Sequence, residues 1–321
     1  MLNISFPKVL SKNKEKRTRS IWKEAARQWE LYLFLLIPLA YLIIFEYIPM
    51  YGVQIAFRNF NFRDGIWGSP WVGLAHFRHF LNSHMFPILM YNTLSISLYS
   101  LIATFPLPII LALLINSVRS MFYKKFVQMA TYLPFFISLV VLVGMMMTIF
   151  NPRTGAYGAI YRFFFDTFPS DPFGRASTFP HLFVWSLAWQ TTGFGAIIYI
   201  AALSAVDPEL YEAAMIDGAS RFKRLLHIDI PKIIPTISIL FILRVGQIMA
   251  VGHERALLMQ TDLNLGRSQI ISTYVFEIGL ATGIGNFSLA AAVGLFNSVI
   301  NIILLVIVNT IARRLSDNSI W

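Results

Sequence analysis

The sequence DPELYEAAMIDGASRFKRLLHIDIPKIIP, residues 207–235, is a polar segment between two long apolar stretches. Its start is typical of a helix, because Asp207 is a good N-cap, Pro208 suits the first helical position and Glu209 lies in the first turn. Pro231 marks the return to apolar sequence. Small residues lie between these points, where another surface can approach closely: Ala213, Ala214, Gly218 and Ala219. The segment therefore predicts a short helix in a loop between two membrane spans.

Six apolar stretches are long enough to cross the ~30 Å hydrocarbon core of a bilayer. They are residues 31–49, 88–115, 126–150, 181–203, 233–251 and 287–311. The chain of 321 residues is 56% hydrophobic and only 13% charged, which excludes disorder and nearly excludes a soluble enzyme. The sequence thus predicts an all-α membrane protein with six transmembrane helices in one domain, 31–311. Pro106 and Pro108 predict a kink in the second span.

Lys and Arg residues number 26 against 16 Asp and Glu residues, for a net charge of +10. In a soluble protein this excess suggests nucleic acid, but in a membrane protein its placement sets orientation. Seventeen basic residues lie before the first span, after the last, or in the loops 116–125 and 204–232, whereas eight lie in the other loops. The positive-inside rule therefore predicts a multi-pass protein of the bacterial cytoplasmic membrane with both termini in the cytoplasm, and no nucleic-acid partner.

Residues 1–30 form a basic cytoplasmic segment before the first span, and residues 312–321 form a short cytoplasmic tail. Within the first segment, residues 14–30 (KEKRTRSIWKEAARQWE) place Trp22 and Trp29 on one helical face, opposite a basic face. This pattern predicts an interfacial amphipathic helix in contact with membrane lipid. The alternative is a plain basic flank that stops translocation.

The motifs Glu212-Ala213-Ala214, Asp217-Gly218-Ala219 and Ile228-Asp229-Ile230-Pro231 resemble the EAA loop of ABC-importer permeases, at the spacing of that family. Four further stretches are similar to carbohydrate-uptake permeases of the maltose-permease type: YIPMYGVQIAFRNF (47–60), SPWVGLAHF (69–77), YLPFFISLVV (132–141) and AALSAVDPELYEAAMIDGAS (201–220). Within that group they are most similar to the branch that imports oligosaccharides from polysaccharides such as alginate. The resemblance implies the type I ABC importer permease fold and transport by alternating access.

The resemblance also implies partners. They are a second, homologous permease subunit that completes a heterodimer, two ATPase subunits that bind ATP and Mg, and an extracytoplasmic solute-binding protein. In the family the EAA loop forms a coupling helix that docks on an ATPase, with Glu212 facing polar or basic groups, Gly218 allowing a bend and Pro231 stiffening the junction. The coupling residues it implies are Glu212, Ala213, Ala214, Asp217, Gly218, Ala219 and Pro231. The alternative for each is ordinary helix and turn chemistry.

Candidate residues for a carbohydrate path lie inside three spans. Arg244 falls near the middle of the fifth, where an ionisable side chain is a functional candidate by default, and it either binds an acidic sugar or bonds groups within the bundle. Asn297 and Asn301 share one face of the sixth and either line a polar path or join helices. The fourth span offers an aromatic face and an amide: Trp185, Trp189 and Gln190. Aromatic residues in spans, however, more often pack within the bundle or face lipid.

The sequence contains no Cys and no GxxxxGK[ST] segment, and no catalytic or metal-ligating set is evident. It therefore predicts a non-catalytic subunit with no cofactor of its own, whose energy comes from the partner ATPases. An ion-driven secondary transporter is one alternative, but it needs acidic groups at the midplane, where only Arg244 is ionisable. An integral membrane enzyme is the weaker alternative. The predicted substrate is an oligosaccharide, with an acidic polysaccharide such as alginate or pectin as the hypothesis for its source.

Overall fold

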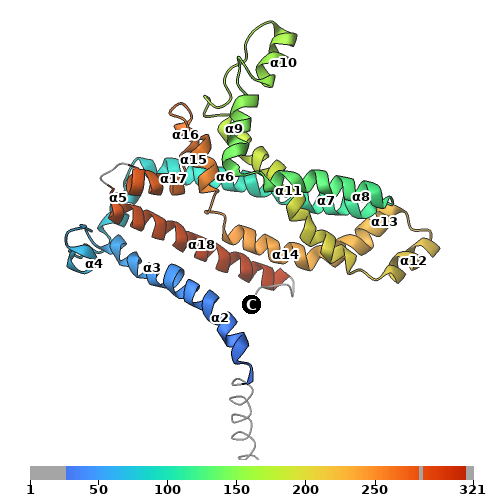
Figure 1. Cartoon of the computed structure of the whole chain (residues 1–321), viewed down its shortest axis with the longest axis horizontal. Helices are drawn as coiled ribbons and strands as arrows, with labels where there is room; N and C mark the ends of the chain where they lie inside the picture. Colours follow the sequence, from blue (N-terminus) through green and yellow to red (C-terminus); the bar gives the residue numbers. More distant parts are fainter. Residues whose placement is uncertain (1–26, 282–284, 316–321) are drawn as a thin grey trace, which may run out of the picture. The chain divides into compact units, whose positions relative to one another are not determined.

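The computed structural model describes residues 27–281 and 285–315 (Figure 1). It is 77% helical and has no strand within the described residues, which confirms the all-α prediction. Arg58 and Trp71 form an isolated β-bridge. Most of the helix predicted at 14–30, and the tail from residue 316 onward, lie outside the described residues.

The chain divides into two units, Met1–Gln54 and Ile55–Trp321. The first contains a continuous apolar helix, made of α2 (Trp29–Leu42), the π-helical turn η1 (Ile43–Tyr47) and α3 (Ile48–Met50). The 3-10 segment η2 (Tyr51–Phe57) leads from it into the second unit. The helix Trp29–Phe57 is long and apolar enough to span a membrane, so the first predicted span is confirmed.

The second unit begins with two short helices, α4 (Gly65–Gly68) and α5 (Ala75–Leu81). Its middle part contains α6 (Met85–Thr104), α7 (Pro106–Ser117), α8 (Met121–Tyr132), η3 (Leu133–Phe136), α9 (Leu139–Ile149), α10 (Ala156–Phe165) and α11 (Phe179–Ser204). The remainder contains α12 (Pro208–Ile216), α13 (Arg221–Arg224), η4 (Leu225–Asp229), α14 (Ile230–Gly246), α15 (His253–Met259), α16 (Leu265–Ser268), α17 (Ile271–Phe276), η5 (Glu277–Ala281) and α18 (Phe287–Leu315).

Among the described residues, five helices can cross a membrane, and a sixth span exists if one bent pair is counted as a single span. The pair joins Met121–Phe136 to Leu139–Ile149 at an angle of 98°. The third predicted span, 126–150, therefore corresponds to this bent pair, and the sequence did not indicate the bend. Ile137 and Ser138 are extended, and the Ser138 hydroxyl accepts a hydrogen bond from the Val141 amide at 3.4 Å, so a new helix begins at this point.

Two other spans differ in detail from the predicted ones. The second, Met85–Ser117, changes from α6 to α7 at Phe105, just before Pro106, whose missing N–H interrupts the helical hydrogen bonds. Phe105 keeps helical backbone angles, so the span continues through the predicted kink position. The fifth begins at Arg221 and ends at Gly246, so it starts well before and finishes short of the predicted range 233–251.

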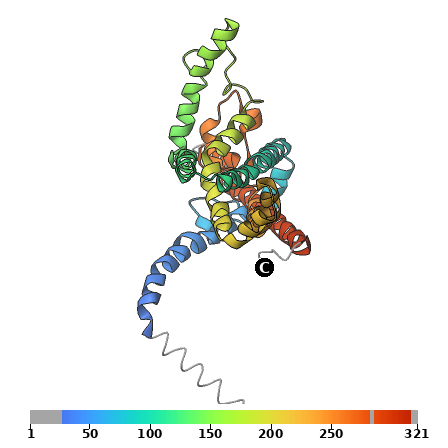
Figure 2. The ribbon, with the colours of Figure 1, turned by 90° about the vertical axis from the view of Figure 1, so that its right-hand side faces the viewer.

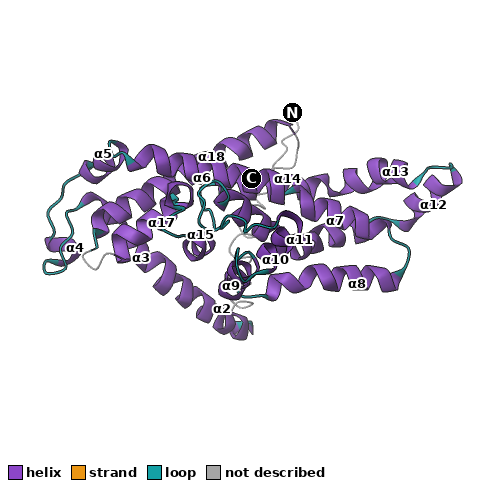
Figure 3. Cartoon of the chain, turned by 90° about the horizontal axis from the view of Figure 1, so that it is seen from above, coloured by secondary structure: helices purple, strands orange, loops and turns teal. Residues whose placement is uncertain are grey.

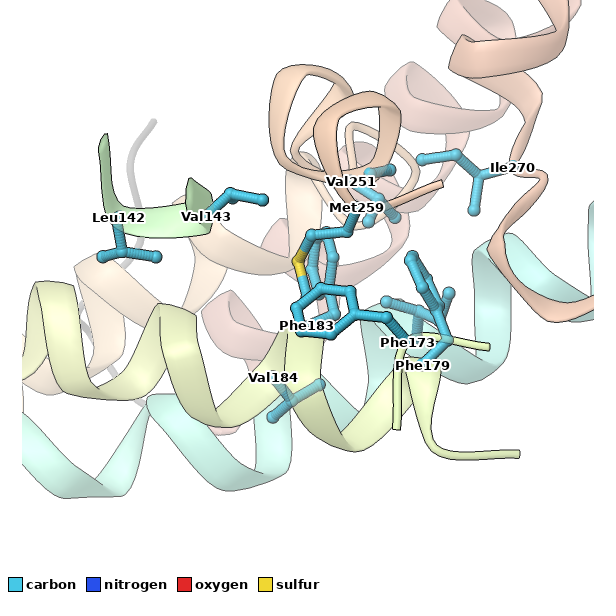
Figure 4. Close-up of a cluster of buried hydrophobic side chains, with 11 residues drawn as sticks. Leu142, Val143, Phe173, Phe179, Phe183, Val184, Val251, Met259 and Ile270 are labelled. Carbon is cyan, nitrogen blue, oxygen red and sulfur yellow. The ribbon is translucent and has the colours of Figure 1, made fainter. Parts of the chain in front are cut away.

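The core of the second unit forms around α11, which packs along α6 and α7, while α14 packs along α18 (Figures 1 and 3). Gly193 lets α11 approach α8, because a Cβ at this position would lie 1.9 Å from the Thr131 carbonyl oxygen. Phe179 and Phe183 of α11 belong to a buried cluster with Met259 of α15 (Figure 4). Helices α9 and α10 project from the bundle in two perpendicular views (Figures 1 and 2).

Candidate functional site

Helix α12 occupies the position predicted for the coupling helix, and its first turn has the expected cap. The Asp207 carboxylate accepts a hydrogen bond from the Glu209 amide at 3.0 Å, and Pro208 fills the first helical position. This satisfies one of the amide groups that a helix start leaves unpaired. The helix start is thus encoded locally by the residues DPE.

The end of α12 depends on Gly218. The Ala219 amide donates to the Ala214 carbonyl at 2.8 Å and the Gly218 amide donates to the Met215 carbonyl at 3.1 Å, which together form a Schellman motif. Gly218 has a φ of +71°, in the left-handed region that favours glycine. A Cβ at this position would meet no described atom within 4 Å, so its backbone conformation, not crowding within the chain, requires glycine.

The helix after this turn continues into the fifth span. The Ser220 hydroxyl caps α13 by accepting a hydrogen bond from the Lys223 amide at 3.3 Å. From Arg221 to Gly246 the chain is one continuous helix, and its π-helical turn η4 ends two residues before Pro231. The wider hydrogen-bond spacing of η4 accommodates the missing amide hydrogen of Pro231 without breaking the helix. The structure therefore places Pro231 within a continuous helix, where the sequence indicated a junction.

One face of α12 is exposed. Glu212, Ala213 and Asp217 are exposed, and the apolar Ile216 has 87% of its surface accessible. Ala214 and Ala219, which take part in the Schellman motif, are partly buried. The predicted coupling residues therefore divide into an exposed face and a set that shapes the turn.

The buried carboxylate of Asp229 ties this loop to the bundle. It accepts hydrogen bonds from the Tyr211 hydroxyl of α12 and from the Asn116 amide of α7, the latter at 3.3 Å. Asp229 is 4% exposed. Basic side chains line the same cavity, which has a volume of about 200 Å³: Arg119, Arg221 and Arg224.

A second cavity, of about 210 Å³, lies at the far end of α14. Arg244 lines it, as do Ser97 and Ser100 of α6 and Arg255 of α15. Within the described residues, the buried hydroxyls of Ser97 and Ser100 have no hydrogen-bond partner. Two guanidinium groups and two unpaired hydroxyls at one cavity provide donors suited to an anionic or hydroxyl-rich ligand.

Arg255 is buried and held by neutral groups. Its guanidinium donates to the Ser186 hydroxyl at 2.8 Å and to the Gln190 side-chain carbonyl, both on α11. The Gln190 amide in turn donates to the Ile137 carbonyl at 2.8 Å, at the break between η3 and α9. Burial lowers the pKa of Arg255 to about 10, so its guanidinium remains charged at neutral pH.

The tryptophans predicted for the path lie elsewhere on α11. Trp185 and Trp189 line a third cavity, of about 370 Å³, together with residues of α7 and α8. The Trp185 indole also donates to the Tyr99 hydroxyl at 2.9 Å, which is 3.0 Å from Nδ1 of His181. The structure thus separates the aromatic pair from Arg244, and it places Gln190 in a buried network.

The amides of the sixth span bond the chain that follows α14. Asn301 accepts a hydrogen bond from the Met249 amide at 3.0 Å, and the Asn297 amide group lies 3.5 Å from the Met249 carbonyl. These contacts correspond to the helix-joining alternative for the two residues. In the described part of the chain, the buried Asn297 side-chain oxygen has no hydrogen-bond partner.

Sequence reasoning missed Arg255, Asp229 and Asn116. Arg255 lies between the fifth and sixth predicted spans, and the structure buries it against the fourth span. Asp229 is part of the quoted motif, but no sequence signal points to its partner 113 residues earlier. The one available signal was a carboxylate placed among the apolar residues Ile228 and Ile230.

The sequence and the fold are similar to those of known transport proteins. Residues 104–317 match the family described as "Binding-protein-dependent transport system inner membrane component". Protein LplB of Bacillus subtilis is 39% identical, with 94% of each chain covered. The Bacillus subtilis polygalacturonan/rhamnogalacturonan transport system permease protein YteP is 37% identical, over 96% of this chain and 95% of that protein.

Two solved structures have the same fold. A chain of a bacterial ABC transporter involved in the import of the acidic polysaccharide alginate has a TM-score of 0.83 and 35% identity, covering 92% of this chain and 99% of its own. A chain of the bacterial alginate ABC transporter in complex with alginate pentasaccharide-bound periplasmic protein has a TM-score of 0.84, 34% identity and coverages of 93% and 99%. The predicted type I ABC importer permease fold is confirmed, and the ion-driven transporter and the membrane enzyme are not favoured. The chain belongs to the family of inner membrane components of binding-protein-dependent transport systems, as an ABC importer permease.

Proposed function

We propose that this permease imports oligosaccharides derived from acidic polysaccharides, in a complex energised by separate ATPase subunits. The observation that carries the proposal is the pair of guanidinium groups, Arg244 and Arg255, at one cavity. In the described residues no carboxylate forms an ion pair with either group. A uronate carboxylate supplies the missing charge, and sugar hydroxyls suit the unpaired Ser97 and Ser100 hydroxyls.

The relatives support the same substrate class. YteP is named as a permease of a polygalacturonan/rhamnogalacturonan transport system, and the two solved structures are of an alginate ABC transporter. Polygalacturonan and alginate are polymers of uronic acids, whose carboxylates are ionised at neutral pH. The carbohydrate in this proposal is therefore an anionic oligosaccharide delivered by an extracytoplasmic solute-binding protein.

ATP hydrolysis is assigned to partner subunits, because the sequence contains no GxxxxGK[ST] phosphate-binding segment. ATP and Mg would bind there, not on this chain. The exposed face of α12, with Glu212 and the 87% exposed Ile216, would dock on one ATPase, and a second permease subunit would complete the path. In this arrangement, both termini and α12 lie on the cytoplasmic side, as the distribution of basic residues indicates.

The direct test is sugar-dependent ATP hydrolysis by the complete complex in proteoliposomes, with the solute-binding protein added. Alginate and polygalacturonate oligosaccharides are compared with neutral maltooligosaccharides of equal length. Stimulation by the acidic oligosaccharides is the expected result. Stimulation by the neutral ones alone contradicts the substrate class, and transport without any ATPase contradicts the whole proposal.

Glu212→Lys tests the docking role of α12. The substitution reverses a charge on an exposed helix face, so the bundle is expected to remain inserted while sugar transport falls about tenfold or more. Transport and ATP hydrolysis are measured on the same proteoliposomes, with membrane insertion checked by fractionation. Glu209→Gln, also on α12, is the matched control. Full transport by the Glu212→Lys complex would contradict this role.

A further inference from the structure

The loop 207–235 makes a buried polar contact through the carboxylate of Asp229. This contact is separate from the helix caps of the loop and from the exposed face of α12. Asp229 is 4% exposed, and its Oδ1 atom accepts hydrogen bonds from both the Tyr211 hydroxyl and the Asn116 amide. One oxygen atom thus joins three elements: α12, the end of α7 and the helix that continues into α14.

The hydrogen bonds of Asp229 are costly to break. A buried carboxylate is costly unless it is hydrogen bonded, so removing either donor leaves part of a buried charge unsatisfied. Arg224 lines the same cavity of about 200 Å³, so a positive charge is present beside this network. Burial and the neighbouring Asp229 carboxylate raise the pKa of Tyr211 to about 12, so the phenol keeps its proton and donates at neutral pH.

The two helices joined in this way are also two walls of the other cavity. Asn116 lies at the end of the span Met85–Ser117, whose earlier residues Ser97 and Ser100 line the cavity that contains Arg244. Asp229 lies in the helix Arg221–Gly246, which carries Arg244 itself. A displacement of α12 therefore reaches both walls through one carboxylate, without passing through the turn at Gly218.

We propose that Asp229 is a positioning residue that links the coupling helix α12 to the second and fifth spans, so that both cavity walls move with α12. This inference rests on the proposed coupling function. Glu212 and the exposed face of α12 would receive the displacement from the ATPase, and Asp229 would distribute it within the permease. Tyr211 and Asn116 are the two donors through which it acts.

The test measures the number of ATP molecules hydrolysed per sugar transported by the complete complex in proteoliposomes. Asp229→Ala removes the acceptor and is expected to raise this ratio about fivefold or more. Asp229→Asn keeps an acceptor oxygen and is expected to raise it less than about twofold. Tyr211→Phe removes one donor and is expected to give an intermediate value, with no further effect in the Asp229→Ala background.

Matched controls come from exposed positions. Tyr123→Phe changes an exposed tyrosine of α8, and Asp262→Asn changes an exposed aspartate near α16. Both are expected to leave the ratio unchanged. If Asp229→Ala does not assemble, Tyr211→Phe decides the question. A ratio that is unchanged in Tyr211→Phe, or that changes as much in the controls, overturns the proposal.

Hydrogen exchange separates this inference from the function on which it rests. In the purified complex without ATP, Asp229→Ala is expected to increase amide exchange in residues 208–216, because α12 loses its buried anchor. Increased exchange with an unchanged ATP-to-sugar ratio overturns the positioning role alone. A wild-type complex that hydrolyses ATP without transporting any oligosaccharide overturns the proposed function instead.

Discussion

Asp229 and Arg255 are the two charged side chains that lie buried in the described part of the second unit, and they differ in what surrounds them. Both are hydrogen bonded to neutral side chains, but Asp229 shares its cavity with basic side chains: Arg119, Arg221 and Arg224. Arg255 is bonded only to the neutral Ser186 and Gln190 side chains, and its cavity contains a second guanidinium, from Arg244.

The difference distinguishes an internal connection from a site for a ligand. A buried carboxylate that has basic side chains in its own cavity needs no ligand to balance its charge, so the region around Asp229 is suited to transmitting movement. A buried cation that shares its cavity with a second cation is more stable when an anion enters. We therefore expect the two ends of the helix Arg221–Gly246 to have separate roles, which substitutions at each end should separate in experiment.

The largest expected effect is at the cavity end. Arg255→Gln removes a charged donor and is expected to raise the KM for uronate oligosaccharides about tenfold, the equivalent of about 1.4 kcal/mol, while the ATP-to-sugar ratio stays unchanged. Arg255→Lys keeps the charge and should restore part of the affinity. The measurement is uptake into proteoliposomes over a range of sugar concentrations.

Arg255 does not bind substrate if its substitution has the effect expected for Asp229, which is an increased number of ATP molecules hydrolysed per sugar. Equal losses for acidic and neutral oligosaccharides, together with an increased ATP-to-sugar ratio, would show that Arg255 is part of the mechanical connection. Such a result would also remove the main support for an acidic substrate.

A smaller effect is expected at the coupling end. Gly218→Ala places a Cβ on a residue with φ of +71°, at a cost of about 1–2 kcal/mol, and so weakens the end of α12. Transport is expected to fall about threefold to tenfold with no change in preference between acidic and neutral sugars. Gly218→Asn is the control, because asparagine tolerates this conformation better. A changed sugar preference would contradict the separation of roles.

The smallest effect is expected just beyond the end of α14, where the chain contacts α18. Asn301→Ala removes the hydrogen bond to the Met249 amide and should lower the stability of the complex by about 1 kcal/mol, without altering sugar preference or the ATP-to-sugar ratio. Thermal unfolding of the detergent-solubilised complex measures the loss. Asn297→Ala, whose contact is longer at 3.5 Å, should cost less. A selective loss of acidic-sugar uptake in Asn301→Ala would assign this residue to the path instead.

The features that sequence predicts well in this chain are local or periodic. Long apolar stretches predict spans because burial in lipid requires about 20 apolar residues in a helix, and Asp207 and Pro208 predict the start of α12 by capping. The 98° bend in the third span was missed, because Pro134 and Ser138 are both tolerated inside a membrane helix.

The contacts that complete each site are not local. Asn116 and Asp229 are 113 residues apart, and Arg255 and Gln190 are 65 residues apart, so no spacing in the sequence joins them. Trp185 and Arg244 were grouped because both lie in spans, but helix rotation directs them to different cavities. Only the packing of α6, α11 and α14 determines which side chains meet.

The π-helical turn η4 also matters for the direction in which later side chains of the same helix point, relative to α12. Each residue of an α-helix turns the chain by about 100°, so deleting one residue between Lys232 and Leu243 would rotate Arg244 relative to α12 by about that angle. A π-turn contains one residue more than the α-helical turn it replaces. A single deletion within Leu225–Asp229, at a position other than Asp229, would convert that turn to α-helix and keep Arg244 in phase. The extra residue of η4 thus leaves the direction of Arg244 unchanged, while it provides the wider hydrogen-bond spacing that Pro231 needs.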